Sequence, residues 1–343
     1  MRDAFGESLC CPILDSNPSA MTLKKRSLSG IKPTGTPHLG NYLGMIKPAI
    51  KMQETHQTFY FIADYHALTS IREPESLKEH SYDLTATFAS LGMDFEEHAF
   101  FRQSDIPEVT ELTWFLACLT SKGLMERAHA FKDAQSKGQD VNMGLFSYPI
   151  LMAADILIYD SHVVPVGKDQ KQHLEITRDL ALRFNHLYGE TLVVPEAIIE
   201  DQVAVIPGLD GQKMSKSYNN VIPLFAPEKQ LRKAIMKIET DSKTVEEVKD
   251  PESCNVFQLF QCFADQSAQQ DLAEQYRAGG MGYGTAKQIC FEAIRDELKD
   301  ASEHYHQIRG DHAHLEGILE GGKDKARKVA RDVVDRVRNK VGL

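Results

Sequence analysis

The 343-residue sequence lacks the features that mark several classes of protein. It has no apolar run of the length that crosses a bilayer, and its first 20 residues lack the sustained apolar core of a signal peptide. Its six cysteines form no C-x-x-C pair, and the chain contains no internal repeat and no low-complexity tract. We therefore predict a cytoplasmic globular protein with reduced thiols, no membrane partner and no structural metal.

The overall charge is acidic, with 39 lysines and arginines against 49 aspartates and glutamates. A net charge of −10 argues against a protein that binds nucleic acid through its overall field. Residues 323–340 differ, because they carry eight basic residues against three acidic ones. The C-terminal segment is therefore compatible with a local surface that meets a polyanion.

Residues 29–44 predict a strand, a tight turn and a helix that begins near Leu39. The start of a helix offers unpaired N–H groups that can hold phosphate. His38 and Asn41 lie three residues apart on one face, and both carry donors suited to phosphate oxygens. Gly40 would let a nucleotide approach the backbone. An ordinary turn with a helix cap fits the same residues.

A second polar segment reads Lys213-Met214-Ser215-Lys216-Ser217 and follows two glycines, Gly208 and Gly211. Two lysines and two hydroxyls beside glycine predict a mobile cationic loop. A lysine ammonium is a compact, flexible charge that can follow a phosphate as its charge shifts. Taken alone, the pentapeptide also fits a solvated surface loop.

The order of elements predicts an α/β fold followed by a helical region. We predict strands at residues 58–63, 99–103 and 163–166, and helices at 74–91, from 107, 143–159 and 170–188, with a mobile connection at 126–144 and Trp114 in the core. Past residue 227 we predict helices only: 231–238, 256–264, 272–276, 286–298 and 315–341. The expected division is a disordered extension (1–21), a Rossmann-like, doubly wound catalytic domain (22–223) and an all-α domain with a basic C-terminal helix (224–343).

Asp155 stands within an apolar helical series, on one face with Tyr148 and Met152. A carboxylate there is costly unless it is paired or used. His66 follows a predicted strand, where doubly wound folds place ligand groups. The residues alone leave open a structural carboxylate that pairs with an arginine or caps a helix, and a satisfied loop histidine.

His38-Leu39-Gly40-Asn41, followed much later by Lys213 to Ser217, resembles the two signatures of class I aminoacyl-tRNA synthetases. Residues 148–157, 164–173 and 178–189 look like tryptophanyl-tRNA synthetases, and the similarity runs from about residue 23 to the end of the chain. The resemblance implies ATP-dependent attachment of L-tryptophan to tRNA(Trp) through tryptophanyl-adenylate. It also implies Mg²⁺ that accompanies ATP, a helical domain that reads the anticodon, and a homodimer.

The expected site follows from these motifs and the resemblance. Catalytic roles are expected for His38, Asn41, Lys132, Lys213 and Lys216. ATP binding is expected from Lys32, Pro33, Thr34, Gly40, Asn41, Gly167, Lys168, Asp169, Lys213, Met214, Ser215, Lys216 and Ser217. Tryptophan binding is expected from Gly30, His66, Tyr148, Met152, Asp155 and Gln170.

Three positions depart from the family pattern: Lys32, Ala134 and Lys168. The alternatives are tyrosine specificity, a catalytically weak paralogue with an RNA-binding or regulatory role, and a generic nucleotide-binding α/β enzyme. The setting of Asp155 favours tryptophan, and the lysines retained at 213 and 216 favour an active enzyme.

Overall fold

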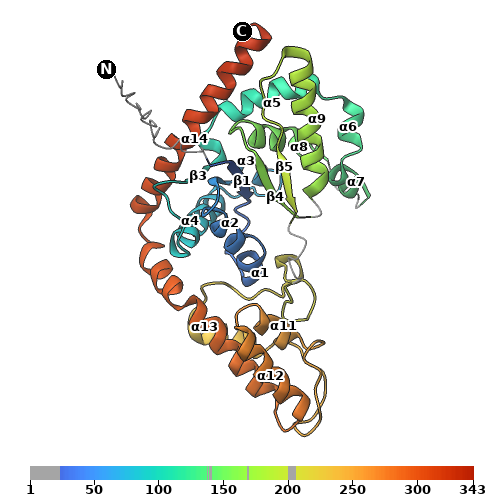
Figure 1. Cartoon of the computed structure of the whole chain (residues 1–343), viewed down its shortest axis with the longest axis vertical. Coiled ribbons are helices and arrows are strands. Elements are labelled where there is room, and N and C mark those ends of the chain that lie inside the picture. Colours follow the sequence, from blue (N-terminus) through green and yellow to red (C-terminus); the bar gives the residue numbers. More distant parts are fainter. Residues whose placement is uncertain (1–23, 137, 139–140, 168–169, 200–205) are drawn as a thin grey trace, which may run out of the picture.

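The structure is a computed structural model that describes residues 24–136, 138, 141–167, 170–199 and 206–343 (Figure 1). The expected disordered extension at 1–21 and two expected ATP-binding residues, Lys168 and Asp169, lie outside the described residues. No helix in the described part of the chain has the length and apolar content that crossing a membrane requires.

A parallel sheet lies at the centre of the molecule. Its strands are β1 (Arg26–Ile31), β2 (Gln57–Ile62), β3 (Ala99–Arg102), β4 (Val163–Val166) and β5 (Glu196–Ile199), in the order β3-β2-β1-β4-β5. β1 pairs with β2 along its whole length and with β4 at Ser27 opposite Val163. The direction of strand order therefore reverses between β1 and β4, and ligands of doubly wound sheets bind beyond such a point. The predicted Rossmann-like fold class is confirmed.

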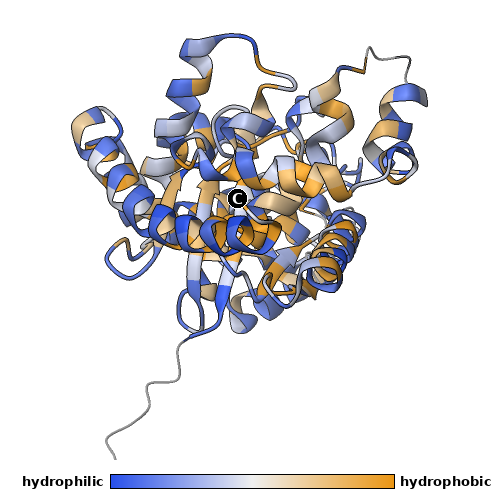
Figure 2. Ribbon diagram, turned by 90° about the horizontal axis from the view of Figure 1, so that it is seen from above, coloured by the Kyte–Doolittle hydropathy of each residue, from blue (hydrophilic) through white to orange (hydrophobic). Residues whose placement is uncertain are grey.

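Helices cover both faces of this sheet. They are α1 (Leu39–Asn41), the π-helical turn η1 (Tyr42–Ile46), α2 (Lys47–Met52), α3 (Asp64–Ala67), α4 (Pro74–Ser90), the 3₁₀ turn η2 (Gln103–Asp105), α5 (Glu108–Leu119), α6 (Lys122–Glu126), α7 (His129–Ser136), α8 (Met143–Leu157) and α9 (Lys171–Tyr188). Hydrophobic residues lie between the sheet and the helices, and hydrophilic residues face outward (Figure 2).

Alternation along β2 builds two cores. Phe59 and Phe61 pack with residues of α5, α8 and α9, and the Phe59 ring lies 5.3 Å from that of Tyr159. Tyr60 and Ile62 point to the other face, where they pack with residues of α2 and α4. Because every residue from 58 to 62 is buried, β2 reads as a continuous apolar run, as expected for a strand covered on both sides.

Past Pro227 the chain is helical, as predicted. It contains α10 (Glu228–Ile235), α11 (Asn255–Gln261), α12 (Gln266–Ala278), α13 (Tyr283–Ile308) and α14 (His312–Val341), and the short 3₁₀ turn η4 (Lys216–Tyr218) precedes them. Two local predictions were wrong: α7 occupies part of the segment expected to be a mobile connection, and Trp114, expected in the core, is 69% exposed. β5 was not among the predicted strands. Trp114 lies off the buried stripe of α5, which is formed by Val109, Leu112, Leu116 and Leu119.

The C-terminal helix α14 returns from the helical region to the sheet, where it runs beside the edge strand β3 (Figure 1). Leu319 joins the core on one face, whereas Ala326, Ala330 and Val333 join the core on the other. The division at residues 223 and 224 stays a prediction, and α14 packs with the sheet that precedes this division.

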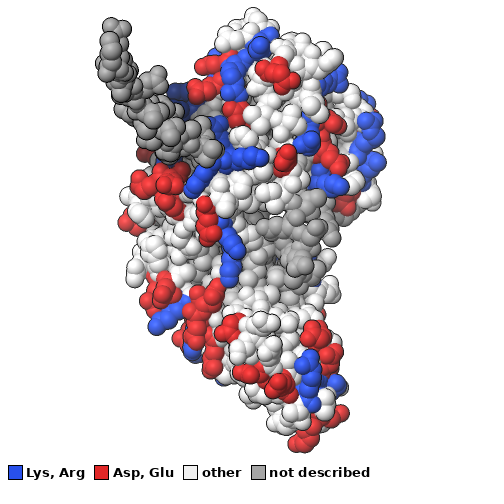
Figure 3. Space-filling model, in the orientation of Figure 1, with Lys and Arg blue, Asp and Glu red and all other residues white. Residues whose placement is uncertain are grey.

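The four arginines of α14, half of its eight basic residues, are paired with carboxylates of the sheet region. Arg327 and Arg331 both contact Glu108 Oε1, at 2.8 and 3.1 Å. Arg338 lies 2.6 Å from Glu111. Basic and acidic side chains are interspersed on the face shown in Figure 3. Half of the basic residues of this helix therefore help to dock it, and the expected surface for a polyanion stays a prediction.

Gly322 is required where α14 crosses the edge strand. A Cβ atom on Gly322 would lie 1.9 Å from the carbonyl oxygen of Phe100, which is backbone and cannot move aside. We expect Gly322→Ala to lower the free energy of unfolding by roughly 1–3 kcal/mol through overpacking. Gly321→Ala is the matched control, because nothing lies within 4 Å of that position and alanine favours helix. Equal stability of the two variants in urea titrations would contradict this account.

Candidate active site

The first predicted signature follows β1, beside the point where strand order reverses. His38 precedes α1 in an extended conformation and caps it: its Nδ1 accepts a hydrogen bond from the N–H of Asn41 at 3.3 Å. In return, the N–H of His38 donates to Oδ1 of Asn41 at 3.2 Å. This reciprocal pair fixes both side chains at the helix start.

The hydrogen bond to Nδ1 determines the form of the His38 ring. Because Nδ1 accepts, the neutral imidazole carries its proton on Nε2, which is then a donor. Burial, assisted by the positive charge of Lys216, lowers the pKa of His38 to about 4. At neutral pH His38 is therefore an uncharged hydrogen-bond donor.

The second signature lies directly on the first, although more than 170 residues separate them. The N–H of Gly40 donates to Sδ of Met214 at 3.2 Å, and Nζ of Lys216 donates to the carbonyl of Thr34 at 3.1 Å. A Cβ on Gly40 would lie 3.2 Å from Cβ of Met214, so glycine permits this close approach.

Backbone hydrogen bonds hold the two segments together. The N–H of Leu39 donates to the carbonyl of Ile222 at 2.9 Å, and the N–H of Leu224 donates to the carbonyl of Pro37 at 3.1 Å. Partial desolvation lowers the pKa of Lys216, whose side chain remains exposed. The loop thus presents an accessible cation beside the first signature.

Asn220 shapes this cationic loop, and the sequence analysis missed it. Its Oδ1 accepts from the N–H of Ser215 at 2.8 Å, and its Nδ2 donates to Asp210 at 2.7 Å and to the carbonyl of Lys213 at 3.2 Å. Gly208 is needed beside it, since a Cβ there would lie 2.4 Å from Cγ of Asn220. Asparagine is so common in turns that its place next to the signature gave no specific signal.

Asp155 is buried, with 1% of its surface exposed, and it is hydrogen-bonded to two neighbours. Its Oδ2 lies 2.8 Å from Nε2 of His66, and Nε2 of Gln103 donates to both carboxylate oxygens at 2.8 and 2.9 Å. Burial raises the pKa of Asp155, while the hydrogen bonds from His66 and Gln103 oppose this rise. Gln103 was also missed; its signal is its place immediately after β3.

Tyr148 completes this cluster. Its hydroxyl lies 2.7 Å from Nε2 of His173, and its ring meets that of His66 edge-on, with centroids 6.1 Å apart. Burial raises the pKa of Tyr148 to about 12. Nζ of Lys32, one of the residues that depart from the family pattern, lies 5.9 Å from the centre of the Tyr148 ring. His66, Tyr148 and Leu151 help to line a cavity of about 180 Å³.

Other expected site residues lie apart from these contacts. Lys132 is exposed on α7, and in the described part of the chain no hydrogen bond or ion pair joins its ammonium to either signature. Gly167 and Gln170 are exposed between β4 and α9. Met152 is half-buried and packs against the core. Gly30 packs closely against the Phe61 ring, since a Cβ at this position would lie 2.5 Å from that ring.

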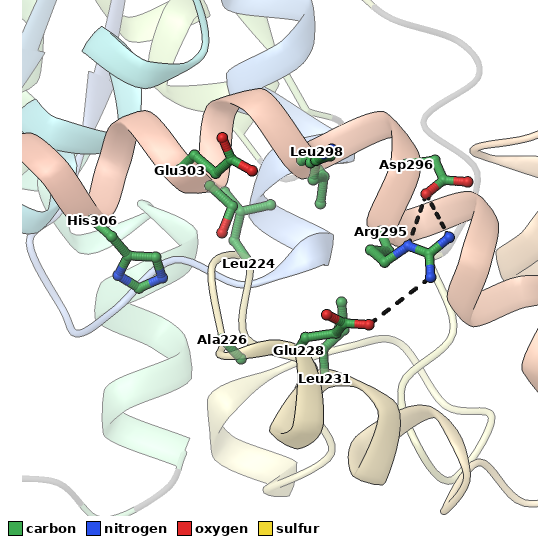
Figure 4. Close-up of a pocket in the computed structure, with 11 residues that line it drawn as sticks. Leu224, Ala226, Glu228, Leu231, Arg295, Asp296, Leu298, Glu303 and His306 are labelled. Atoms are coloured by element: carbon green, nitrogen blue, oxygen red, sulfur yellow. Dashed lines mark hydrogen bonds and ion pairs between the residues drawn. The ribbon is translucent and has the colours of Figure 1, made fainter.

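A cavity of about 450 Å³ lies away from the signatures, between α13 and the segment that leads into α10 (Figure 4). Arg295 points into it and pairs with Asp296 at 2.8 Å and with Glu228 at 3.9 Å. The charge of Arg295 in the cavity wall is thus paired with neighbouring carboxylates, and none of the expected site residues lines this cavity.

Comparison with known proteins decides the family. The family described as tRNA synthetases class I (W and Y) matches residues 22–299. The chain belongs to this family. It is 51% identical to a tryptophan–tRNA ligase of Rhodopirellula baltica over 318 residues, which are 93% of this chain and 99% of the relative.

Solved structures agree with the sequence comparison. The crystal structure of a tryptophanyl-tRNA synthetase from Campylobacter jejuni, complexed with ADP and tryptophan, has a TM-score of 0.88 and 47% identity, covering 93% of this chain and 100% of that one. A tryptophanyl-tRNA synthetase from Mycoplasma pneumoniae has a TM-score of 0.76 and 32% identity, with 94% and 98% covered. The predicted resemblance to tryptophanyl-tRNA synthetases is confirmed.

The lowered pKa of His38 can be measured directly. We expect its ring to titrate with a midpoint of about 4 in NMR, with the signal assigned by its loss in His38→Gln. Because the folded pKa lies below the usual value near 6.5, the unfolded chain binds this proton first. His38 therefore lowers the stability as pH falls from about 6.5 to 4. A midpoint near 6.5 would show that the ring is neither desolvated nor held as an acceptor.

Proposed function

We propose that this chain attaches L-tryptophan to tRNA(Trp) in two steps, using ATP. An oxygen of the tryptophan carboxylate bonds to the α-phosphorus of ATP, the bond to the β-phosphate oxygen breaks, and pyrophosphate leaves. A hydroxyl of the terminal tRNA ribose then attacks the adenylate carbonyl and releases AMP. The observation that carries the proposal is the direct docking of Met214 and Lys216 on the first signature.

The first step needs positioning and charge neutralisation rather than a protein nucleophile. His38 offers Nε2–H and Asn41 offers its amide to the triphosphate, from a helix start that the pair itself caps. Lys213 and Lys216 neutralise the departing pyrophosphate, and Ser215 and Ser217 add hydroxyl donors. Gly40 allows the adenosine to approach the backbone.

The remaining ATP contacts come from two further segments. Lys32, Pro33 and Thr34 form the turn whose carbonyl at Thr34 already binds Lys216. Gly167 follows β4 at the carboxyl edge of the sheet, where nucleotides bind in this fold class, and Lys168 and Asp169 are the next two residues of the sequence. Lys132 reaches the phosphates from α7 in the proposed complex. Mg²⁺ enters as a substrate metal with ATP, held mainly by phosphate oxygens and water.

The proposed tryptophan pocket is centred on Asp155. Indole has one polar atom, a donor, so its recognition requires an acceptor. Asp155 supplies it, and His66 and Gln103 hold the carboxylate in place. The other proposed pocket residues are Gly30, His66, Tyr148, Met152 and Gln170.

The partners follow from the same proposal. The helical region after residue 223 reads the anticodon of tRNA(Trp), and two copies of the chain form a homodimer in the cytoplasm. A regulatory paralogue has no specific observation in its favour, since both lysines of the second signature are present and one of them contacts the first. Tyrosine specificity has none either, because the relatives with 51% and 47% identity are named for tryptophan.

Pyrophosphate exchange tests the proposed reaction. Purified full-length chain with ATP, Mg²⁺ and radioactive pyrophosphate should show exchange that depends on tryptophan, and the same protein should charge tRNA(Trp). Exchange with tyrosine alone would transfer the proposal to the other specificity of the family. Absence of exchange with all twenty amino acids would overturn the proposed enzyme activity.

Lys216→Ala should separate binding from chemistry. Its ammonium donates to the backbone carbonyl of Thr34, and it is proposed to meet the pyrophosphate mainly in the transition state. We expect about a hundredfold slower single-turnover adenylate formation, which corresponds to ~3 kcal/mol, with the KM for tryptophan unchanged. Adenylate formation at the wild-type rate would refute this role.

Asp155→Ala should reduce the selection of tryptophan over phenylalanine. Loss of a hydrogen bond to a charged group costs about 1–3 kcal/mol, so kcat/KM for tryptophan in exchange should fall roughly 5- to 150-fold. Phenylalanine lacks the donor and should lose less.

The matched control for Asp155→Ala is Gln103→Met, which removes one partner of the carboxylate and keeps the carboxylate itself. The ratio of kcat/KM between the two amino acids should stay within about twofold in this variant. An unchanged ratio in Asp155→Ala would make Asp155 a purely structural group.

A further inference from the structure

One buried carboxylate outside the two signatures connects the first signature to the C-terminal helices. Asp83, on α4, is 8% exposed. Its Oδ2 accepts a hydrogen bond from the hydroxyl of Thr36 at 3.3 Å, within the turn that precedes His38. Its Oδ1 accepts from the hydroxyl of Tyr305 at 3.0 Å and from Nε of Arg309. One oxygen of Asp83 therefore binds the signature turn, and the other binds the end of α13.

The partners at the end of α13 are themselves firmly held. The guanidinium of Arg309 also donates to Oε2 of Glu79 at 2.7 Å and to the carbonyl of Glu79 at 3.2 Å. Both contacts come from the same helix, α4, one turn before Asp83. Arg309 thus fixes the position of the Asp83 carboxylate with respect to α4, because it binds both carboxylates of this helix face.

Helix α13 meets the first signature at a second place. Oε1 of Glu297 accepts from the hydroxyl of Tyr42 at 3.2 Å and from Nζ of Lys47 at 2.8 Å. Tyr42 follows Asn41 directly, whereas Thr36 precedes His38 by two residues. The face of His38 and Asn41 that is proposed to bind phosphate therefore has a residue linked to α13 on each side. Tyr42 is linked directly, and Thr36 is linked through Asp83.

The Asp83 carboxylate also lies behind the groups proposed to bind the pyrophosphate. Its negative charge favours the protonated form of Lys216 and so opposes the desolvation that lowers the pKa of this lysine. A Cβ on Gly35 would lie 3.1 Å from Nζ of Lys216 and 3.8 Å from Nε2 of His80, which is on α4. The turn therefore lies against both Lys216 and His80 of α4.

We propose that Asp83 is a positioning residue for ATP, which holds Thr36 and its turn in the geometry that presents His38 and Lys216 to the triphosphate. Arg309, more than 220 residues from Asp83 in the sequence, acts on the same step through that carboxylate. The inference rests on the proposed reaction, and it assigns a role in it to residues outside both signatures.

A merely structural ion pair would behave differently from a positioning residue. If Asp83 only anchors α13, its loss lowers the melting temperature and leaves the kinetics of the folded enzyme unchanged. Tyr82→Phe provides the matched control. Tyr82 is the neighbour of Asp83 on α4, and its hydroxyl donates to Glu316 of α14 at 2.7 Å, so it ties α4 to a C-terminal helix without a hydrogen bond to the signature turn.

The test compares Asp83→Asn, Thr36→Val and Tyr82→Phe in full-length protein, by pyrophosphate exchange at a temperature well below each melting temperature. We expect Asp83→Asn to lower kcat/KM for ATP about tenfold and Thr36→Val about threefold, with the KM for tryptophan within twofold of wild type. Tyr82→Phe should lower the melting temperature and keep the wild-type KM and kcat for ATP.

A double-mutant cycle tests the path from α13. Arg309→Met should also lower kcat/KM for ATP, and its effect should shrink in the Thr36→Val background, because both act through one carboxylate. Additive effects of Thr36→Val and Arg309→Met would overturn the path. Wild-type kcat/KM for ATP in Asp83→Asn and in Thr36→Val would overturn the positioning role, and if Asp83→Asn fails to fold, Thr36→Val alone decides it.

Failure of the proposed reaction gives a different result. If wild-type protein shows no exchange with any amino acid, the affinity for ATP measured by calorimetry replaces the kinetic constants in the same comparison. Weaker ATP binding in Thr36→Val than in Tyr82→Phe would then support Asp83 without the reaction, and equal binding in these two variants would reject it.

Discussion

The contact between the two signature segments is the interaction on which the site depends. Neither segment forms a site alone, because the first supplies a capped helix start and the second supplies the lysine charge. The N–H of Gly40 donates to Met214, and Lys216 donates to the carbonyl of Thr34. Backbone hydrogen bonds made by Leu39 and Leu224 join the first segment to the chain that follows the second. Glycine at position 40 is what lets them approach, and the sheet order places this contact beside β1 at the switch point.

Two buried carboxylates serve this site in different ways. Asp155 receives its donors from His66 and Gln103, both of which belong to the sheet region, so its position is fixed within one part of the molecule. Asp83 receives donors from the signature turn and from α13, so its position depends on two parts. A buried carboxylate is costly without partners, so the donors around each of them stabilise the folded protein.

Much of the fold could be predicted because its signals are local. β2 is a continuous apolar run, and the signature residues follow strand ends or helix starts, where the turn-forming glycines and prolines mark them. What the sequence could not show depends on long-range contacts. β5 is as short as β3 and β4, but it begins with a glutamate that directly follows Pro195, so its composition does not mark it as a strand. Gln103 acts through Asp155, which is about 50 residues away in the sequence, and Asn220 acts through the backbone of an irregular loop. Trp114 is exposed because α5 turns another face to the core.

The charge of the C-terminal helix shows how a pattern that is correct in sequence can serve another purpose in space. A run of basic residues in an acidic chain suggests a surface for a polyanion. In the structure the four arginines of this run meet Glu108, Glu111 and Asp160, and the side chains of Glu108 and Asp160 are only 13% and 15% exposed. Ion pairs with partly buried carboxylates are screened less than those in open water. Gly322 of α14 also packs against the backbone of β3, so the charge and the shape of this helix both direct it to the edge of the sheet. The net charge of the chain stays negative, at −10.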